Sequence, residues 1–81
     1  MSDRTTVELK YPVEIDGAQV SSLTLRRPKV RDNLAAEKMG GSNAEREIAL
    51  LALLAEVSPA ALHELDMGDY AALQKALTSF F

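Results

Sequence analysis

The chain has 81 residues, of which 47% are hydrophobic and 26% charged, and its formal net charge is −3 at pH 7. This length and composition are typical of one small globular domain and argue against a chain that is disordered throughout. The absence of cysteine excludes a disulfide scaffold, thiolate metal sites and thiol catalysis.

No segment has the pattern of a secretion signal or of a membrane span. The first six residues are mostly polar, and the longest apolar run, residues 48–55, is far shorter than the ~20 residues that a spanning helix needs. We therefore expect a soluble protein without a membrane partner.

The first part of the chain has the pattern of a β-hairpin. Every second residue from 7 to 15 is apolar, so one face of this strand would be buried and the other exposed to water. Asp16-Gly17 follows, a pair that suits the two positive φ angles of a type I′ turn. We expect the hairpin over residues 7–27, after a disordered tail over residues 1–6.

The register of this hairpin requires an irregularity. Counting outward from the turn pairs Ile15 with Ala18 and Val13 with Val20, but it would then set hydroxyl side chains on the apolar face. One extra residue near Ser21-Ser22 would restore two apolar pairs, Tyr11 with Leu23 and Leu9 with Leu25. The sequence therefore predicts a β-bulge in the second strand.

The rest of the chain, residues 29–81, has the spacing of three or four short helices. Val30, Leu34 and Ala35 are the apolar residues of the first helix. The expected boundaries are a stop at Gly40-Gly41, a capping box at Ser42 and Glu45, an end near Val57, a start at Ser58-Pro59, and an acidic start at Asp66 and Asp69. The fold class is thus α+β, an N-terminal antiparallel β-hairpin followed by three or four short α-helices, in a single small domain over residues 7–81.

The two longest helices differ in the apolar surface that they present. The last helix has one apolar face, with Tyr70, Leu73, Leu77, Phe80 and Phe81. The second helix is apolar or small over roughly 260° of its surface, and only the sector of Glu45, Ala49 and Glu56 looks exposed to water.

Two interpretations of the second helix stay open. In one, the hairpin covers one side and the last helix covers the other. In the alternative, one face stays available for self-association or for a client helix. The helical candidates for partner binding are Ile48, Leu51, Leu54, Ala55, Phe80 and Phe81.

Residues arranged for catalysis are nearly absent. His63 is the only histidine and has no nucleophile beside it in the sequence. Glu64, Asp66 and Asp69 have a spacing that fits helix capping better than cation binding. Gly40-Gly41 lacks the Lys-Ser/Thr of a phosphate-binding loop. We predict that the protein is not an enzyme and that it has no catalytic, cofactor or metal site.

Four of the nine basic residues lie within positions 26–31. Three interpretations of this cluster are open: contacts with nucleic acid phosphates, local ion pairs to Asp32 or Glu8, and an acidic patch on a partner protein. No aromatic residues are interleaved with the cluster, and the remaining acidic charge disfavours nucleic acid. Arg26 and Arg27 are therefore candidates for binding a protein partner.

Several segments together resemble the small tail assembly chaperones of contractile-tailed phages and related prophages, including Mu-like ones. They are Val7-x-Leu9-x-Tyr11-Pro12-Val13, Asp16-Gly17, Leu23-Thr24-Leu25-Arg26-Arg27-Pro28 and Leu62-x-x-Leu65-Asp66-x-x-Asp69-Tyr70-x-x-Leu73. The resemblance covers roughly residues 7–80 and lies in the order and spacing of the segments. Glu56 departs from it, because relatives often have a glycine at this position.

The resemblance implies a non-enzymatic role in the cytoplasm of the bacterial host. Proteins of this family are thought to bind the long helical tape measure protein, to keep it soluble until tube protein replaces them, and to be absent from the finished virion. The implied partners are the tape measure protein, a frameshift-extended form of this chain, and a second copy in a homo-oligomer. Two rival functions remain, a small DNA-binding regulator that uses Arg26, Arg27, Lys29 and Arg31, and a generic protein-binding adaptor.

Overall fold

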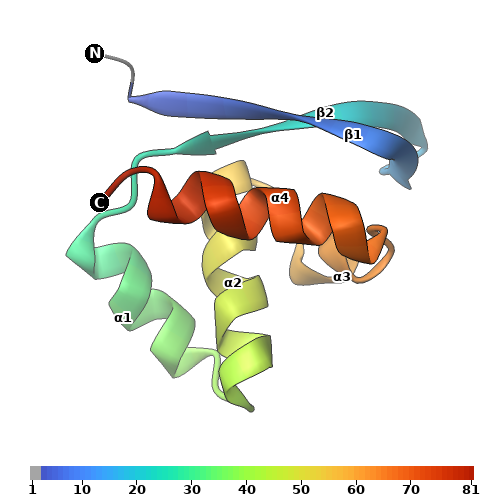
Figure 1. Ribbon diagram of the computed structural model, residues 1–81. Coiled ribbons are helices and arrows are strands. Elements are labelled where there is room, and N and C mark those ends of the chain that lie inside the picture. The colour runs from blue at the N-terminus through green and yellow to red at the C-terminus, as the bar shows by residue number, and fades with distance from the viewer. Residues whose placement is uncertain (1–2) are drawn as a thin grey trace.

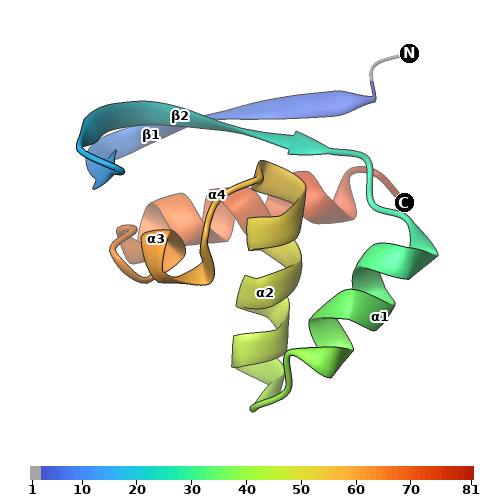
Figure 2. The same cartoon turned by 180° about the vertical axis from the view of Figure 1, so that it is seen from behind.

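The computed structural model describes residues 3–81, which form a two-stranded antiparallel sheet followed by four helices. The hairpin lies across one side of the molecule and the helices pack beneath one of its faces (Figure 1). The reverse view shows the last helix running under the hairpin and the second helix leading away from it (Figure 2). The predicted α+β class is confirmed.

The hairpin is built as its turn sequence predicts. Strand β1 (Arg4–Ile15) joins β2 (Ala18–Arg26) through Asp16 and Gly17, which have φ angles of 52° and 81°. Both angles are positive, as a type I′ turn requires. Because β1 begins at Arg4, residues 4–6 belong to the strand and not to the tail expected there. Residues 1–2 of that tail lie outside the described residues.

The predicted bulge in the second strand is wrong, because the irregularity lies in β1. Val13 pairs with Val20 as expected, but Leu23 pairs with Val7 and not with Tyr11. Residues 9–12 of β1 therefore lie opposite Ser21 alone, between the regular pairs on either side. Tyr11 leaves the buried face and is 63% exposed.

The bulge in β1 has a cause elsewhere in the chain. The backbone N–H groups of Lys10 and Tyr11 donate to the carboxylate of Asp69 at 3.0 and 3.1 Å, and Pro12 has no N–H to pair. These amides are satisfied by a side chain from the last helix in place of the neighbouring strand.

The helices begin and end close to the predicted positions. They are α1 (Val30–Lys38), α2 (Asn43–Ala55), α3 (Pro59–His63) and α4 (Met67–Thr78). Gly40 and Gly41, with φ angles of 71° and 91°, follow the end of α1. The end of α2 comes two residues before Val57, because Glu56 adopts a left-handed conformation.

The three predicted N-terminal caps are confirmed. The Ser42 hydroxyl accepts from the Glu45 N–H at 3.2 Å, and the Glu45 carboxylate accepts from the Ser42 N–H at 2.9 Å. Ser58 caps α3 through the N–H of Ala61, and Asp66 caps α4 through the N–H of Gly68. Each cap satisfies a backbone donor that the helix itself leaves unpaired.

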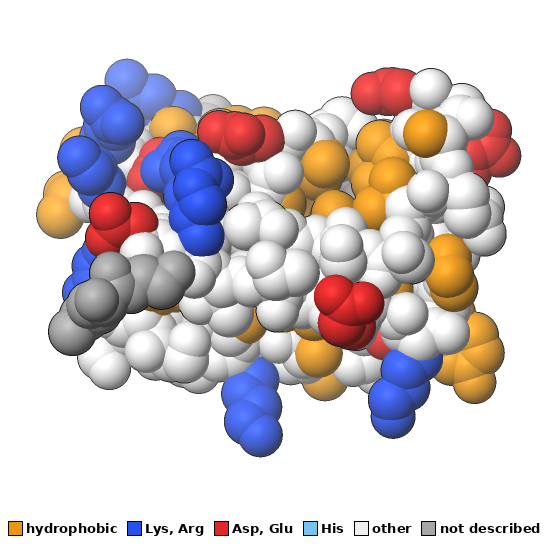
Figure 3. Space-filling model, turned by 90° about the horizontal axis from the view of Figure 1, so that it is seen from above, with side chains coloured by type: hydrophobic (Ala, Val, Ile, Leu, Met, Phe, Trp, Pro, Cys, Tyr) orange, Lys and Arg blue, Asp and Glu red, His pale blue; other side chains and the backbone are white. Residues whose placement is uncertain are grey.

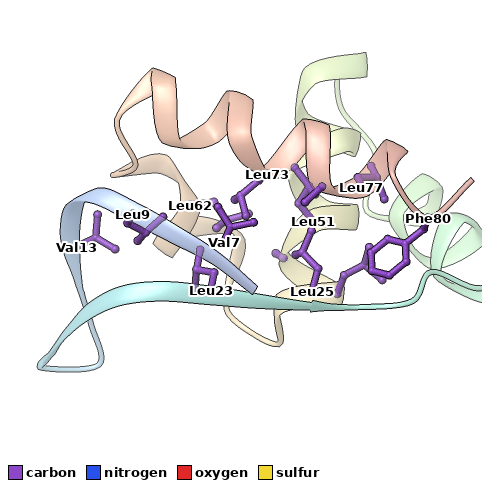
Figure 4. Close-up of a cluster of buried hydrophobic side chains, with 13 residues drawn as sticks. Val7, Leu9, Val13, Leu23, Leu25, Leu51, Leu62, Leu73, Leu77 and Phe80 are labelled. Atoms are coloured by element: carbon purple, nitrogen blue, oxygen red, sulfur yellow. The ribbon is translucent and has the colours of Figure 1, made fainter. Parts of the chain in front are cut away.

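The core lies between the inner face of the hairpin and the helices (Figure 4). Side chains from both strands point towards side chains from α2, α3 and α4 in this view. Four leucines are the largest fully buried residues: Leu25, Leu51, Leu54 and Leu73. Burial of each leucine stabilises the fold by about 1.5–3 kcal/mol, so these positions hold the hairpin onto the helices.

Helix α2 occupies the middle of the helical layer and contacts α1, β2, α3 and α4. Ala49, which the sequence pattern placed in the exposed sector, is only 3% exposed. Helix α1 packs on α2, and each of these helices has a nearly fully buried alanine, Ala36 in α1 and Ala49 in α2. The pattern failed here because an alanine suits a close helix contact as well as a solvated position.

Candidate protein-binding surface

The eight residues predicted to bind a partner occupy different environments. Leu51 and Leu54 have no exposed surface, and Phe80 is 8% exposed, so all three belong to the core. Ile48 and Ala55 are half-buried at its edge. Phe81 is 87% exposed and is the one helical candidate that projects fully into solvent.

A shallow apolar groove lies between α1, α2 and the end of the chain, and we call it the α1 groove. Its volume is about 240 Å³, and it is lined by Pro28, Lys29, Val30, Asn33, Leu50 and Phe81. Val30 is 78% exposed, and Leu34, one helical turn further along α1, is 58% exposed. Large apolar side chains at this exposure form a surface that a partner can bury.

The apolar face of α1 is exposed because other residues of this helix make its packing contacts. Asp32 and Ala36 are the buried residues of α1. They turn the helix so that Val30 and Leu34 face away from the core. Sequence reasoning did not select these two residues, because their spacing is also that of an ordinary packed face.

The rotation of α1 is fixed by an ion pair to the end of β2. The Arg26 guanidinium donates two hydrogen bonds to the Asp32 carboxylate, at 2.7 and 2.8 Å. The Lys29 backbone N–H donates to the same carboxylate at 2.8 Å. The Arg26 hydrogen bonds are the main cause that lowers the pKa of Asp32 from 3.8 to about 2. A local ion pair at Asp32, one of the three interpretations of the basic cluster, is therefore present.

Five basic side chains, Arg26 among them, gather around a hollow of about 460 Å³. Its lining residues are Asp3, Arg4, Arg26, Arg27, Lys29 and Arg31. The guanidinium of Arg27 lies 5.9 Å from the centre of the Phe80 ring, within the range of a cation–π contact. The view from above shows Lys and Arg side chains gathered at one end of the molecule (Figure 3). We call this part of the surface the basic end.

A second apolar hollow, of about 440 Å³, lies between α2, α3 and α4. It is lined in part by Ile48, Leu65, Met67 and Tyr70, and Met67 is 78% exposed. The Glu47 carboxylate at its rim accepts hydrogen bonds from the Tyr70 hydroxyl and the Gln74 amide, at 2.6 and 2.8 Å. Burial and the nearby carboxylate raise the pKa of Tyr70 above its usual value of 10, so its hydroxyl remains a donor.

Neither a metal cluster nor a spanning helix is found among residues 3–81. No three His, Cys, Asp or Glu side chains in this part of the chain come together as metal ligands. None of its helices is both long and apolar enough to cross a membrane. His63 is exposed, while Asp66 and Asp69 make the hydrogen bonds described above.

These features define a small α+β protein whose exposed apolar surfaces suit the binding of another protein. The chain belongs to the family of phage tail assembly chaperone proteins, described as E, or 41 or 14, and the family model matches residues 6–81. The resemblance seen in the sequence is thus confirmed over nearly the whole chain. No significant match is found among curated proteins or among solved structures. Membership of this family points to a non-enzymatic role with protein partners in tail assembly.

Proposed function

We propose that this protein binds the tape measure protein of the phage tail and keeps it soluble in the host cytoplasm during assembly. It would leave before the virion is complete, when tube protein takes its place. The family supports a role in tail assembly, and the α1 groove supplies a surface for an apolar client. A frameshift-extended form of the chain is a further partner in this proposal.

The observation that carries the proposal is the exposed apolar face of α1. Val30, Leu34 and Phe81 are all more than half exposed, although their side chains are of the kind that proteins bury. A client helix lying along α1 would cover them and would bury its own apolar side chains in the groove. Such a contact asks for little beyond apolar side chains at helical spacing on the client.

The proposed mechanism separates stability from client binding. The core leucines hold the hairpin on the helices, while Val30 and Phe81, which line the α1 groove, are not part of that core. Substitutions in the groove should therefore leave the fold intact and weaken client binding alone. The α1 groove is shallow and offers few polar contacts, so it should bind the client reversibly. A competing tube protein could then displace the chaperone.

The experiment is co-expression with the tape measure protein of the same phage. The soluble fraction of the tape measure protein and its copurification with the chaperone are measured for the wild type and for Val30→Glu combined with Leu34→Glu. We expect the double variant to remain folded, and the tape measure protein to become insoluble. The control is Met67→Glu, which alters an equally exposed residue in the hollow between α2, α3 and α4.

The two variants also locate the client. Loss of solubility with Met67→Glu, and not with the α1 variant, would place the client in the second hollow. A wild-type chaperone that neither copurifies with the tape measure protein nor changes its solubility would contradict the proposed function.

A further inference from the structure

We propose that the hollow between α2, α3 and α4 is a second docking site, which takes a lysine side chain from a partner protein. The site is separate from the α1 groove and does not rest on the proposed binding of the tape measure protein there. The feature that carries it is the carboxylate of Glu47, which the fold holds at an apolar hollow without a cation beside it.

Three helices build this hollow from segments that are far apart in the sequence. Helix α2 contributes Glu47, and the first two turns of α4 contribute Tyr70 and Gln74. Figure 1 and Figure 2 both show α3 beside the start of α4, where it closes one side of the site. The walls are mainly apolar, and their larger side chains are Ile48, Leu62, Leu65 and Met67.

Both hydrogen bonds that hold the Glu47 carboxylate arrive at the same oxygen. The Tyr70 hydroxyl and the Gln74 amide donate to Oε1 at 2.6 and 2.8 Å. Tyr70 and Gln74 lie one helical turn apart, so one face of α4 fixes this carboxylate in place. Two donors fill the two acceptor positions of Oε1. The other oxygen, Oε2, accepts no hydrogen bond from residues 3–81 and is left for a ligand.

No ion pair joins Glu47 to a cationic side chain of residues 3–81. Arg46, its neighbour in sequence, pairs with Glu37 at 3.2 Å and donates to the Gly41 carbonyl. A half-buried carboxylate attracts a cation more strongly than an exposed one does, because less water screens it. The net charge of −3 also attracts a basic segment. The basic end, which would repel such a segment, lies at the opposite side of the molecule from α3 (Figure 1).

A lysine side chain matches both the apolar walls and the carboxylate. Its four-carbon stem can lie along Leu65 and Met67, while its ammonium group donates to Oε2 of Glu47. An arginine guanidinium favours a fork across both carboxylate oxygens, and Oε1 already has its two donors. Met67 is 78% exposed, so the contact also buries apolar surface. The occupant is therefore a lysine that is flanked by apolar residues in a segment of a partner protein.

The test is an NMR titration of the full, isotope-labelled chain with a short alanine-glutamine peptide that contains one Leu-Lys pair. A second peptide has norleucine in place of the lysine, and a third has arginine. We expect the lysine peptide to shift the amide signals of Ile48, Leu65 and Tyr70. It should bind at least about tenfold more tightly than the norleucine peptide, which cannot make a charge-assisted hydrogen bond. The arginine peptide should bind more weakly than the lysine peptide.

Two variants test the site from the side of the protein. Glu47→Gln keeps an oxygen that accepts from Tyr70 and Gln74, but it removes the charge, so the lysine peptide should bind at least about tenfold more weakly. Met67→Lys sets a cation at the rim at an exposed position and should weaken the same peptide by like-charge repulsion. Circular dichroism checks that both variants fold.

The matched control is Glu14→Gln, which removes the same charge from an acidic hollow at the hairpin turn. That hollow has a volume of about 490 Å³, and its carboxylates are those of Glu14, Asp16 and Glu64. The control should bind the lysine peptide as the wild type does. A control as weak as Glu47→Gln would assign the binding to general attraction by acidic side chains and would overturn the proposal.

Two further results would also overturn it. One is a lysine peptide that leaves the signals of the hollow unshifted, and the other is equal affinity for the lysine and norleucine peptides. The double variant of the α1 groove, Val30→Glu with Leu34→Glu, should bind the lysine peptide at least as tightly as the wild type. Failure of this site and failure of the proposed function are therefore measured separately.

Discussion

The carboxylate of Asp69 accepts a hydrogen bond from the backbone N–H of Tyr11, across 58 residues of sequence and at 3.1 Å. The same carboxylate accepts from the N–H of Lys10, and the Asp69 residue is only 3% exposed. The first turn of α4 thereby replaces the sheet hydrogen bonds that β1 loses at its bulge. This contact fixes where the last helix sits under the hairpin.

Asp69→Ala should destabilise the protein by about 1–3 kcal/mol, because two partly buried amides lose their acceptor. Urea unfolding gives the free energy, and amide hydrogen exchange shows whether Lys10 and Tyr11 in particular lose protection. The control is Asp66→Ala, which removes the cap of the same helix at a cost of about 1 kcal/mol. The control should leave these two amides protected, and equal protection in both variants would contradict the assignment.

The ion pair between Arg26 and Asp32 makes stability depend on pH. The pKa of Asp32 is about 2 in the folded protein against 3.8 ordinarily, so folding favours the charged carboxylate. Its contribution is complete above the ordinary pKa and is lost as the pH falls through about 2. The difference corresponds to about 2 kcal/mol. Asp32→Asn should lower the free energy of unfolding at neutral pH. The fall of this free energy between neutral and acid pH should then be smaller by about that amount.

The measurement is the free energy of unfolding of wild type and Asp32→Asn from about pH 5 to about pH 2. Subtracting the variant's curve removes the titration of the other carboxylates. If the two free-energy curves stay parallel over this pH range, the ion pair between Arg26 and Asp32 does not contribute to the pH dependence of stability. Arg26 is not the titrating partner, because its hydrogen bonds to Asp32 raise its pKa further above its usual range.

Local signals predicted most of the fold. The alternation in β1, the Asp16-Gly17 turn and the Ser42–Glu45 capping box each act within a few residues, so the sequence shows them directly. The position of the bulge depends on Asp69, a residue distant in sequence. Counting pairs outward from the turn therefore placed the extra residue on the wrong strand.

The surface was harder to predict than the fold, for the same reason. A helical spacing of apolar residues shows that a face exists, and it does not show what covers that face. Leu51 and Val30 both lie on apolar helix faces, yet the first is fully buried and the second is 78% exposed. Val30 is exposed because α1 buries Asp32, which pairs with Arg26, and Ala36 in its place.

Truncation to alanine should therefore affect stability strongly at Leu51 and very little at Val30. Leu51→Ala leaves a cavity among the core leucines and should cost about 2–5 kcal/mol. Val30→Ala removes side-chain atoms from the surface and should change stability by less than about 0.5 kcal/mol. Urea unfolding of both variants decides the assignment. A large loss with Val30→Ala would show that the α1 groove is part of the stabilising core.

Glu56 is held in a conformation that suits glycine, with φ 59° and ψ 44°, where α2 ends. The Val57 N–H donates to the Ala52 carbonyl at 3.0 Å, so the turn around Glu56 is required to close the helix. A residue with a side chain pays about 1–2 kcal/mol of strain in this region, and glycine avoids that strain. The greater freedom of glycine in the unfolded chain offsets part of this benefit. Glu56→Gly should therefore stabilise the protein by about 0.5–1 kcal/mol, which raises Tm by about 2–8 °C in a domain of this size.

Glu56→Ala is the matched control, because it removes the same charge and keeps the strained φ. Thermal unfolding should order the three proteins with glycine highest, and an alanine variant as stable as the glycine variant would assign the effect to charge.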